Sequence, residues 1–202
     1  MPYQRRLIAS GSAAPMIPLY IINATAGAHR PAILHTHGGG FILGSAESDL
    51  IDLQKTAQAL DCVIVSVDYR LAPETRYQGS IADNYAGLRW LADHGAELGA
   101  DTTRIALMGE SAGGGHAALL ARRGDLSGLP KCFIGVGSID LFVDEDLEYG
   151  RRLIDAGVET ELVVVPGAYH GFDGIAPPAG VSRRFEAARL TALRRAFSIT
   201  SA

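Results

Sequence analysis

Cysteine, lysine and long apolar runs are all scarce in this sequence. Only two cysteines, Cys62 and Cys132, occur among 202 residues, and both fall in runs that we interpret as buried strands. We expect such thiols to be reduced and to pack in the interior, with a disulfide or a metal pair as the alternative. The low cysteine content therefore predicts a cytoplasmic protein.

Strong charge of either sign is missing as well. The formal net charge is −4 at pH 7, and the 18 basic residues are almost all arginine. The sequence therefore has no excess of positive charge that would attract nucleic acid or an anionic membrane. Near the N-terminus, Pro15 and Pro18 interrupt any apolar run before a signal-peptide core could form, and no apolar stretch approaches membrane-spanning length. We therefore expect neither nucleic acid nor a membrane as a partner.

The sequence contains no internal repeat, no low-complexity tract and no linker long enough to divide it, so we predict one domain over residues 1–202. Short β-rich runs alternate with helical stretches. Several of the runs lack polar alternation, which is typical of a sheet covered by helices on both faces. The pattern predicts an α/β fold with a mostly parallel sheet and right-handed crossovers. Strands are expected at 17–23, 31–37, 62–69, 104–109, 132–138 and 160–165, and helices at 49–60, 80–94, 112–123, 144–156 and 181–197.

A candidate nucleophile lies between a predicted strand and a predicted helix, where residues 109–113 read Gly-Glu-Ser-Ala-Gly. A serine on so tight a turn needs small residues two positions away on either side, because the strained backbone leaves no room for side chains. The turn would also place Ser111 at a helix N-terminus, whose partial positive charge favours a developing anion. A G-x-S-x-G pattern also arises by chance, so the prediction of a catalytic Ser111 depends on this context.

Three successive glycines, residues 38–40, follow His37 at the end of another predicted strand. They cost conformational entropy, and a plain turn would need only one or two. Bare backbone would let two N–H groups approach a tetrahedral oxyanion, and the N–H of Ala112 could supply a third donor. A phosphate-cradling loop and a flexible surface turn are the alternatives. No lysine follows the glycines and no G-x-G-x-x-G spacing occurs, which speaks against phosphate.

A serine hydroxyl needs a base, and His170 is the best candidate because it follows a predicted strand in a glycine-flanked loop. Active sites of open α/β sheets gather at the carboxyl ends of the strands. We expect His37 to brace the glycine loop by hydrogen bonds, His116 to pack in the helix after Ser111, and His29 and His94 to be solvated residues of a loop or a helix end. The six histidines are His29, His35, His37, His94, His116 and His170.

The third member of a triad must be a carboxylate at the end of another strand, where it can orient the imidazole. Asp140 occupies such a position. The acids at 144–146 open a predicted helix and are more simply interpreted as capping and dipole partners. The resulting order of serine, aspartate and histidine is the order of the α/β-hydrolases.

These segments together resemble the hormone-sensitive-lipase-like branch of the α/β-hydrolases, the bacterial family IV esterases. The resemblance extends from about Pro31 to Asp173. Residues 37–40 match the oxyanion motif of that branch, 68–74 its middle signature and 109–114 its nucleophile motif, while 140–145 and 169–172 resemble its acid and histidine segments.

The resemblance implies roles for further residues. Gly39, Gly40 and Ala112 would donate to the oxyanion, and Arg70 and Glu74 would be structural. Glu110 stands where relatives usually carry aspartate. No metal or organic cofactor is implied, and a homodimer formed through an edge strand is expected from the habit of relatives.

The sequence departs from the family in one interval. Asp140 follows Ser111 by only 29 positions, bridged by residues 123–130, where relatives place a further core strand and part of a helical cap. We therefore expect a compact α/β-hydrolase with a reduced or absent cap. Either the strand at 132–138 moves up beside the nucleophile strand, or a gap is left that a partner chain or a rearranged segment must fill.

The residues favour ester hydrolysis by Ser111, His170 and Asp140 through an acyl-enzyme, and the resemblance and the reduced cap imply short acyl chains as substrates. The small-molecule ester would be the partner. One alternative is a catalytically degenerate homologue that binds small molecules, because a missing segment could separate the triad. Another is a peptidase or amidase with the same triad, although nothing in the sequence specifies recognition of a peptide backbone.

Overall fold

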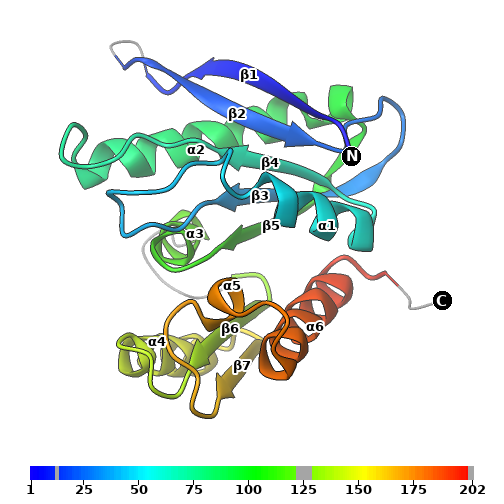
Figure 1. Ribbon diagram of the computed structural model, residues 1–202. Helices are drawn as coiled ribbons and strands as arrows, with labels where there is room; N and C mark the ends of the chain where they lie inside the picture. The colour runs from blue at the N-terminus through cyan, green and yellow to red at the C-terminus, as the bar shows by residue number, and fades with distance from the viewer. Residues whose placement is uncertain (12–13, 122–128, 200–202) are drawn as a thin grey trace. The chain divides into compact units, whose positions relative to one another are not determined.

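The computed structural model describes residues 1–11, 14–121 and 129–199 (Figure 1). The chain divides into two units, Met1–Ala121 and Arg122–Ala202, and each is described by itself. The prediction of one domain over residues 1–202 is not tested by this division and stays a prediction.

A five-stranded sheet forms the centre of the first unit, with the strand order β1-β2-β4-β3-β5. Strands β4, β3 and β5 run parallel to one another, while β1 and β2 are antiparallel to their neighbours. The mostly parallel character that the sequence predicts is confirmed in the part that carries the candidate serine. The strands are β1 (Tyr3–Ala9), β2 (Met16–Ile22), β3 (Arg30–Thr36), β4 (Val63–Val67) and β5 (Ala100–Gly109).

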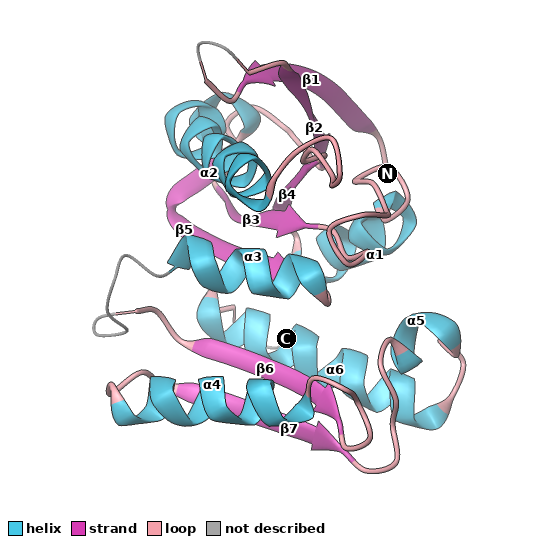
Figure 2. Ribbon diagram, turned by 90° about the vertical axis from the view of Figure 1, so that its left-hand side faces the viewer, coloured by secondary structure: helices cyan, strands magenta, loops and turns pink. Residues whose placement is uncertain are grey.

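Helices cover both faces of this sheet. Figure 2 shows α1 and α2 on opposite sides of the strands, which explains why β4 is buried along its whole length. A strand that is buried on both faces has a continuous apolar sequence, and this pattern in the sequence predicts such strands. The helices are α1 (Leu50–Leu60), α2 (Tyr77–His94), the short 3₁₀ helix η1 (Gly95–Leu98) and α3 (Ala112–Ala121).

Strand β1 is not among the predicted strands. Six of its seven residues are exposed, and only Ile8 is buried. An edge strand with so little burial carries no apolar alternation, so its sequence gives no strand signal.

The second unit contains a two-stranded parallel sheet, β6 with β7, between helices α4 and α6 (Figure 2). Its elements are β6 (Cys132–Gly137), α4 (Val143–Asp155), β7 (Thr160–Val165), α5 (Phe172–Ile175) and α6 (Gly180–Ala196). Helix α4 has acids in its first turn and Arg152 in its last, as the sequence predicts, and this arrangement complements the helix dipole.

Part of the interval between the units is not described. Residues 122 and 123, at the end of the helix predicted at 112–123, lie outside the described residues. The same holds for 123–128 of the predicted bridge at 123–130.

Candidate active site

Ser111 lies on the turn between β5 and α3, as the sequence predicts. Its φ is 54°, in the left-handed region that non-glycine residues rarely adopt. A hydrogen bond of 2.9 Å from the Gly113 N–H to the Glu110 carbonyl closes the turn. Ser111 is exposed and directly precedes the first residue of α3. A strained backbone of this kind costs of order 1 kcal/mol or more and is typical of functional positions.

The flanking glycines are required by close backbone contacts. A Cβ on Gly109 would overlap the carbonyl oxygen of Gly113, and a Cβ on Gly113 would overlap the carbonyl oxygen of Thr36. In addition, the Thr36 hydroxyl donates to the Gly113 carbonyl at 2.7 Å. The turn is therefore packed directly against the end of β3, and this packing is the physical reason for a glycine two positions on either side of the serine.

The glycine loop that follows β3 lies against the same turn. A Cβ on Gly38 would lie 3.0 Å from the Glu110 carbonyl oxygen and 3.7 Å from the Cβ of Ser111. Gly39 has a φ of 116°, and its carbonyl accepts from the N–H of Ile42 at 3.1 Å and of Leu43 at 2.9 Å. The first unit thus brings Ser111 and the three glycines together.

Residues of the middle signature hold the glycine loop. The Tyr69 hydroxyl donates to the His37 carbonyl at 2.8 Å, and the two rings stack with centroids 4.1 Å apart. Asp68 accepts from the N–H of Ala46, a few residues further along the same loop, at 2.9 Å. His37 also contacts the Gly38 carbonyl through Nδ1 at 2.7 Å, and burial lowers its pKa. His37 therefore braces the loop as a neutral ring, which agrees with the prediction.

Arg70 makes a fork-shaped ion pair with Asp83. Its Nε and NH2 groups donate to the two carboxylate oxygens at 2.8 and 2.7 Å, and Asp83 is fully buried. This pair ties the segment after β4 to helix α2, in keeping with the structural role expected of Arg70. Glu74 is exposed.

The second unit brings Asp140 and His170 together. Asp140 Oδ2 lies 2.8 Å from His170 Nδ1, and Asp140 Oδ1 accepts from the Phe142 N–H at 3.0 Å. The Asp140 side chain is 8% exposed and the His170 side chain 37%. A carboxylate on Nδ1 holds the proton there and keeps the basic lone pair on Nε2, which is the tautomer a general base needs.

Backbone contacts join the two loops that carry this pair. The Ser138 N–H donates to the Val165 carbonyl at 2.9 Å, and the Ile139 N–H donates to the Ala168 carbonyl at 3.1 Å. Gly137 has no room for a Cβ because the Ala168 carbonyl oxygen occupies that place. The loops after β6 and β7 are thus fixed to each other.

The acids that follow Asp140 lie where the sequence predicts them, in the first turn of α4. Burial raises the pKa of Asp146, and the negative charge of Asp140 adds to the shift. Asp146 therefore lies in the electrostatic neighbourhood of the pair as well as at the helix N-terminus.

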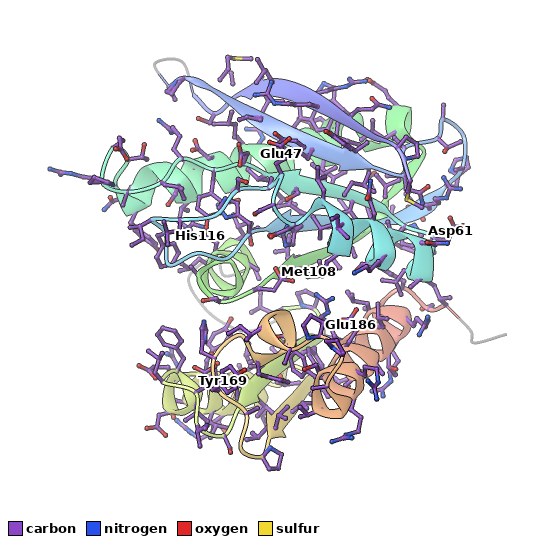
Figure 3. The ribbon with its side chains drawn as sticks, in the orientation of Figure 1. Glu47, Asp61, Met108, His116, Tyr169 and Glu186 are labelled. Carbon is purple, nitrogen blue, oxygen red and sulfur yellow. The ribbon has the colours of Figure 1, made fainter. Side chains whose placement is uncertain are left out.

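His116 packs inside the first unit (Figure 3). Its Nδ1 accepts from the Asn84 side-chain N–H at 2.9 Å, and its ring lies edge-on to Tyr69 with centroids 4.7 Å apart. Burial lowers the pKa of His116 to about 4, and the neighbouring His37 lowers it further. The packing role predicted for His116 agrees with this environment.

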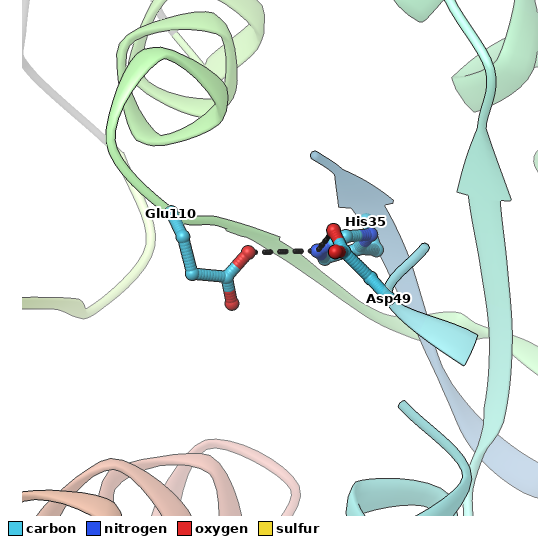
Figure 4. A group of neighbouring side chains, drawn as sticks. All are labelled: His35, Asp49 and Glu110. Atoms are coloured by element: carbon cyan, nitrogen blue, oxygen red, sulfur yellow. Dashed lines mark hydrogen bonds and ion pairs between the residues drawn. The ribbon is translucent and has the colours of Figure 1, made fainter. Parts of the chain in front are cut away.

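One cluster was missed at the level of sequence: His35, Asp49 and Glu110 (Figure 4). His35 Nε2 lies 2.8 Å from Glu110 Oε2 and 4.0 Å from Asp49 Oδ2. The available signal was a histidine in the otherwise apolar run of β3, because a buried polar side chain there needs a partner.

Within the described residues, none of the helices combines the length and the apolar character needed to cross a lipid bilayer.

Comparison with known proteins extends these observations. A family model described as the α/β-hydrolase fold matches residues 33–124 and 116–174. Esterase LipI of Mycobacterium tuberculosis is 46% identical over 107 residues, which cover 52% of this chain and 33% of LipI. Carboxylesterase NlhH of the same species is 28% identical over 235 residues, covering 82% of this chain and 74% of NlhH. Among solved structures, a bacterial heroin esterase matches with a TM-score of 0.91 at 28% identity, covering 97% of this chain and 84% of that one.

Proposed function

Because this chain belongs to the α/β-hydrolase fold family, in its hormone-sensitive-lipase-like branch, we propose that it is a serine esterase acting on short-chain acyl esters. The observation that carries the proposal is the hydrogen bond of 2.8 Å between Asp140 and His170 Nδ1. It supports a base whose Nε2 can take a proton. Ser111, on a strained turn beside the glycine loop, supplies the matching nucleophile.

In the proposed reaction, Ser111 Oγ attacks the ester carbonyl carbon while His170 Nε2 accepts the hydroxyl proton. The N–H groups of Gly39, Gly40 and Ala112 stabilise the oxyanion of the tetrahedral intermediate. His170 returns the proton to the leaving alcohol, and an acyl-enzyme remains on Ser111. Water then repeats the cycle and releases the acid, while Asp140 stabilises the imidazolium at each proton transfer.

Short acyl chains are proposed because the resemblance implies them and because a reduced cap offers little apolar surface to bury a long chain. The location proposed for the protein is the cytoplasm. Both cysteines are free thiols, and burial raises the pKa of Cys62 to about 12, which suits a reduced packing residue. A homodimer remains a proposal taken from the resemblance.

Ser111→Ala tests the nucleophile. Hydrolysis of nitrophenyl acetate and butyrate by the purified chain should fall by about a millionfold in turnover, because removing a catalytic serine forfeits the whole covalent route. Nitrophenyl decanoate should be a poorer substrate for the unsubstituted chain.

Ser198→Ala is the matched control. Ser198 has the same φ of 54° and is also exposed, so the substitution imposes the same backbone demand at a serine that the proposed mechanism does not use. Its activity should stay unchanged. Unchanged activity in Ser111→Ala would exclude Ser111 as the nucleophile, and a soluble, folded chain without any esterase activity would favour the degenerate binding module.

A further inference from the structure

A histidine and two carboxylates from separate segments of the first unit converge on one point (Figure 4). His35 lies near the end of β3, Asp49 is the N-cap of α1, and Glu110 directly precedes Ser111. One ring nitrogen and two carboxylate oxygens lie within 4.8 Å of one another. The catalytic mechanism proposed above uses none of these three side chains.

The separations suit a small divalent cation. His35 Nε2 lies 2.8 Å from Glu110 Oε2 and 4.0 Å from Asp49 Oδ2. Ligand atoms bound tetrahedrally to zinc at about 2.1 Å lie roughly 3.4 Å apart. A cation would therefore need changes of only about 0.6 Å in these two separations. Both carboxylates are partly exposed, with 37% of the Asp49 side chain and 42% of the Glu110 side chain accessible, so they can make this adjustment.

The histidine is already held in the orientation of a metal ligand. His35 is 1% exposed, and its Nδ1 lies 2.8 Å from the hydroxyl of the fully buried Ser66. In the metal-bound form Nδ1–H would donate to that hydroxyl, and Nε2, having lost the proton it shares with Glu110, would direct its lone pair at the cation. Ligand histidines usually have their second ring nitrogen fixed in this way.

The electrostatics favour a cation at the same point. Burial raises the pKa of Asp49, and the negative charge of Glu110 raises it further, while His35 opposes the shift. Two neighbouring carboxylates that destabilise each other's charged form are stabilised when a cation lies between them.

We propose that His35, Asp49 and Glu110 form a binding site for a divalent transition-metal ion, with zinc as the best match to one nitrogen and two oxygen ligands. Water fills the fourth position. Magnesium and calcium fit poorly, because they require six or more oxygen ligands. The bound ion would replace the His35–Glu110 hydrogen bond and connect the N-cap of α1 to the residue before Ser111.

The test is a calorimetric titration of the metal-free full chain with Zn²⁺, and with Mg²⁺ for comparison. One saturable Zn²⁺ per chain is expected, with no saturable Mg²⁺ binding. Asp49→Asn and Glu110→Gln should each weaken Zn²⁺ binding by at least tenfold. Asp52→Asn is the matched control, since Asp52 lies three residues from Asp49 in the same helix and is exposed beside Lys55. That variant should bind Zn²⁺ as tightly as the unsubstituted chain.

A second measurement uses Co²⁺, whose visible absorption reports a nitrogen and oxygen ligand set. The absorption band should appear with one equivalent and be lost in both ligand variants. Circular dichroism of each variant checks that it is folded. Absence of saturable Zn²⁺ binding, or Zn²⁺ binding that survives in both Asp49→Asn and Glu110→Gln, would overturn the proposal.

Discussion

At the scale of single residues, the buried His116 makes stability depend on pH. Its Nδ1 accepts a hydrogen bond from Asn84, so a proton on that nitrogen would both break the bond and bury a charge. Burial lowers the pKa of His116 to about 4 from an ordinary value of 6.5. Between those two values the unfolded chain binds more protons than the folded chain. The contribution of His116 to the free energy of unfolding therefore falls as the pH is lowered from about 6.5 towards 4.

We predict that His116→Gln reduces this dependence. Denaturant unfolding at pH 7 and at pH 5 should show a smaller loss of stability in the variant than in the unsubstituted chain. His37, whose pKa burial also lowers, leaves a residual slope of the same sign. His29→Gln is the control, because His29 is exposed and should leave the slope unaltered. An equal slope in His116→Gln and in the unsubstituted chain would contradict the assignment.

The candidate site was predictable from the sequence in part. Ser111, Asp140 and His170 each follow a predicted strand. Active sites of α/β sheets usually lie at the carboxyl ends of the strands. The His35, Asp49 and Glu110 cluster was not predictable, because its members lie in three segments with no common motif. Only the fold brings these segments together.

At the scale of elements, substitutions at two glycines of helix α3 should have opposite effects on stability. A Cβ on Gly113 would overlap the Thr36 carbonyl oxygen, whereas a Cβ on Gly115 would have only the Phe41 ring at 4.0 Å. Gly113→Ala should therefore destabilise the protein by about 3 kcal/mol, because the rigid backbone of β3 cannot move aside. Gly115→Ala should stabilise it by about 1 kcal/mol, because alanine is the better helix former.

Thermal and urea unfolding of the two variants measure this difference. Gly115→Ala serves as the control for Gly113→Ala, since both make the same substitution in the same helix. Similar stabilities for the two variants would show that the turn between β5 and α3 is not packed against β3 as described.

The elements themselves were predictable where burial is complete and unpredictable where it is not. Strand β4 is buried at every position and was predicted from its apolar run. Strand β1 is mostly exposed, so its sequence shows no alternation of apolar and polar residues that would predict a strand. A single buried residue, Ile8, is too few to show the two-residue periodicity of a strand.

At the scale of the whole molecule, the prediction of one domain can be tested by unfolding. Trp90, the sole tryptophan, lies in α2 and stacks on His94 with centroids 5.0 Å apart, so its fluorescence reports on the first unit. Far-UV circular dichroism reports on all helices. In the part of the second unit that the structure describes, the sheet has two strands, and a sheet of two strands is marginally stable at best on its own. We therefore predict coincident urea transitions for the two signals.

Two separate transitions would show that the chain folds as two domains. The fluorescence of Trp90 would then keep its native value through the first loss of circular dichroism, or change before it. Repeating the measurement at two protein concentrations would show whether the midpoint depends on association, as expected for a homodimer.

The close approach of Gly137 to the Ala168 carbonyl has a consequence for redesign. Because backbone contacts and a hydrogen bond from the Gly167 N–H to the Ser138 hydroxyl fix the loop of Asp140 to the loop of His170, substitutions elsewhere in the second unit should leave that spacing intact. Any side chain at position 137 would instead wedge the two loops apart, so a library should leave this glycine untouched.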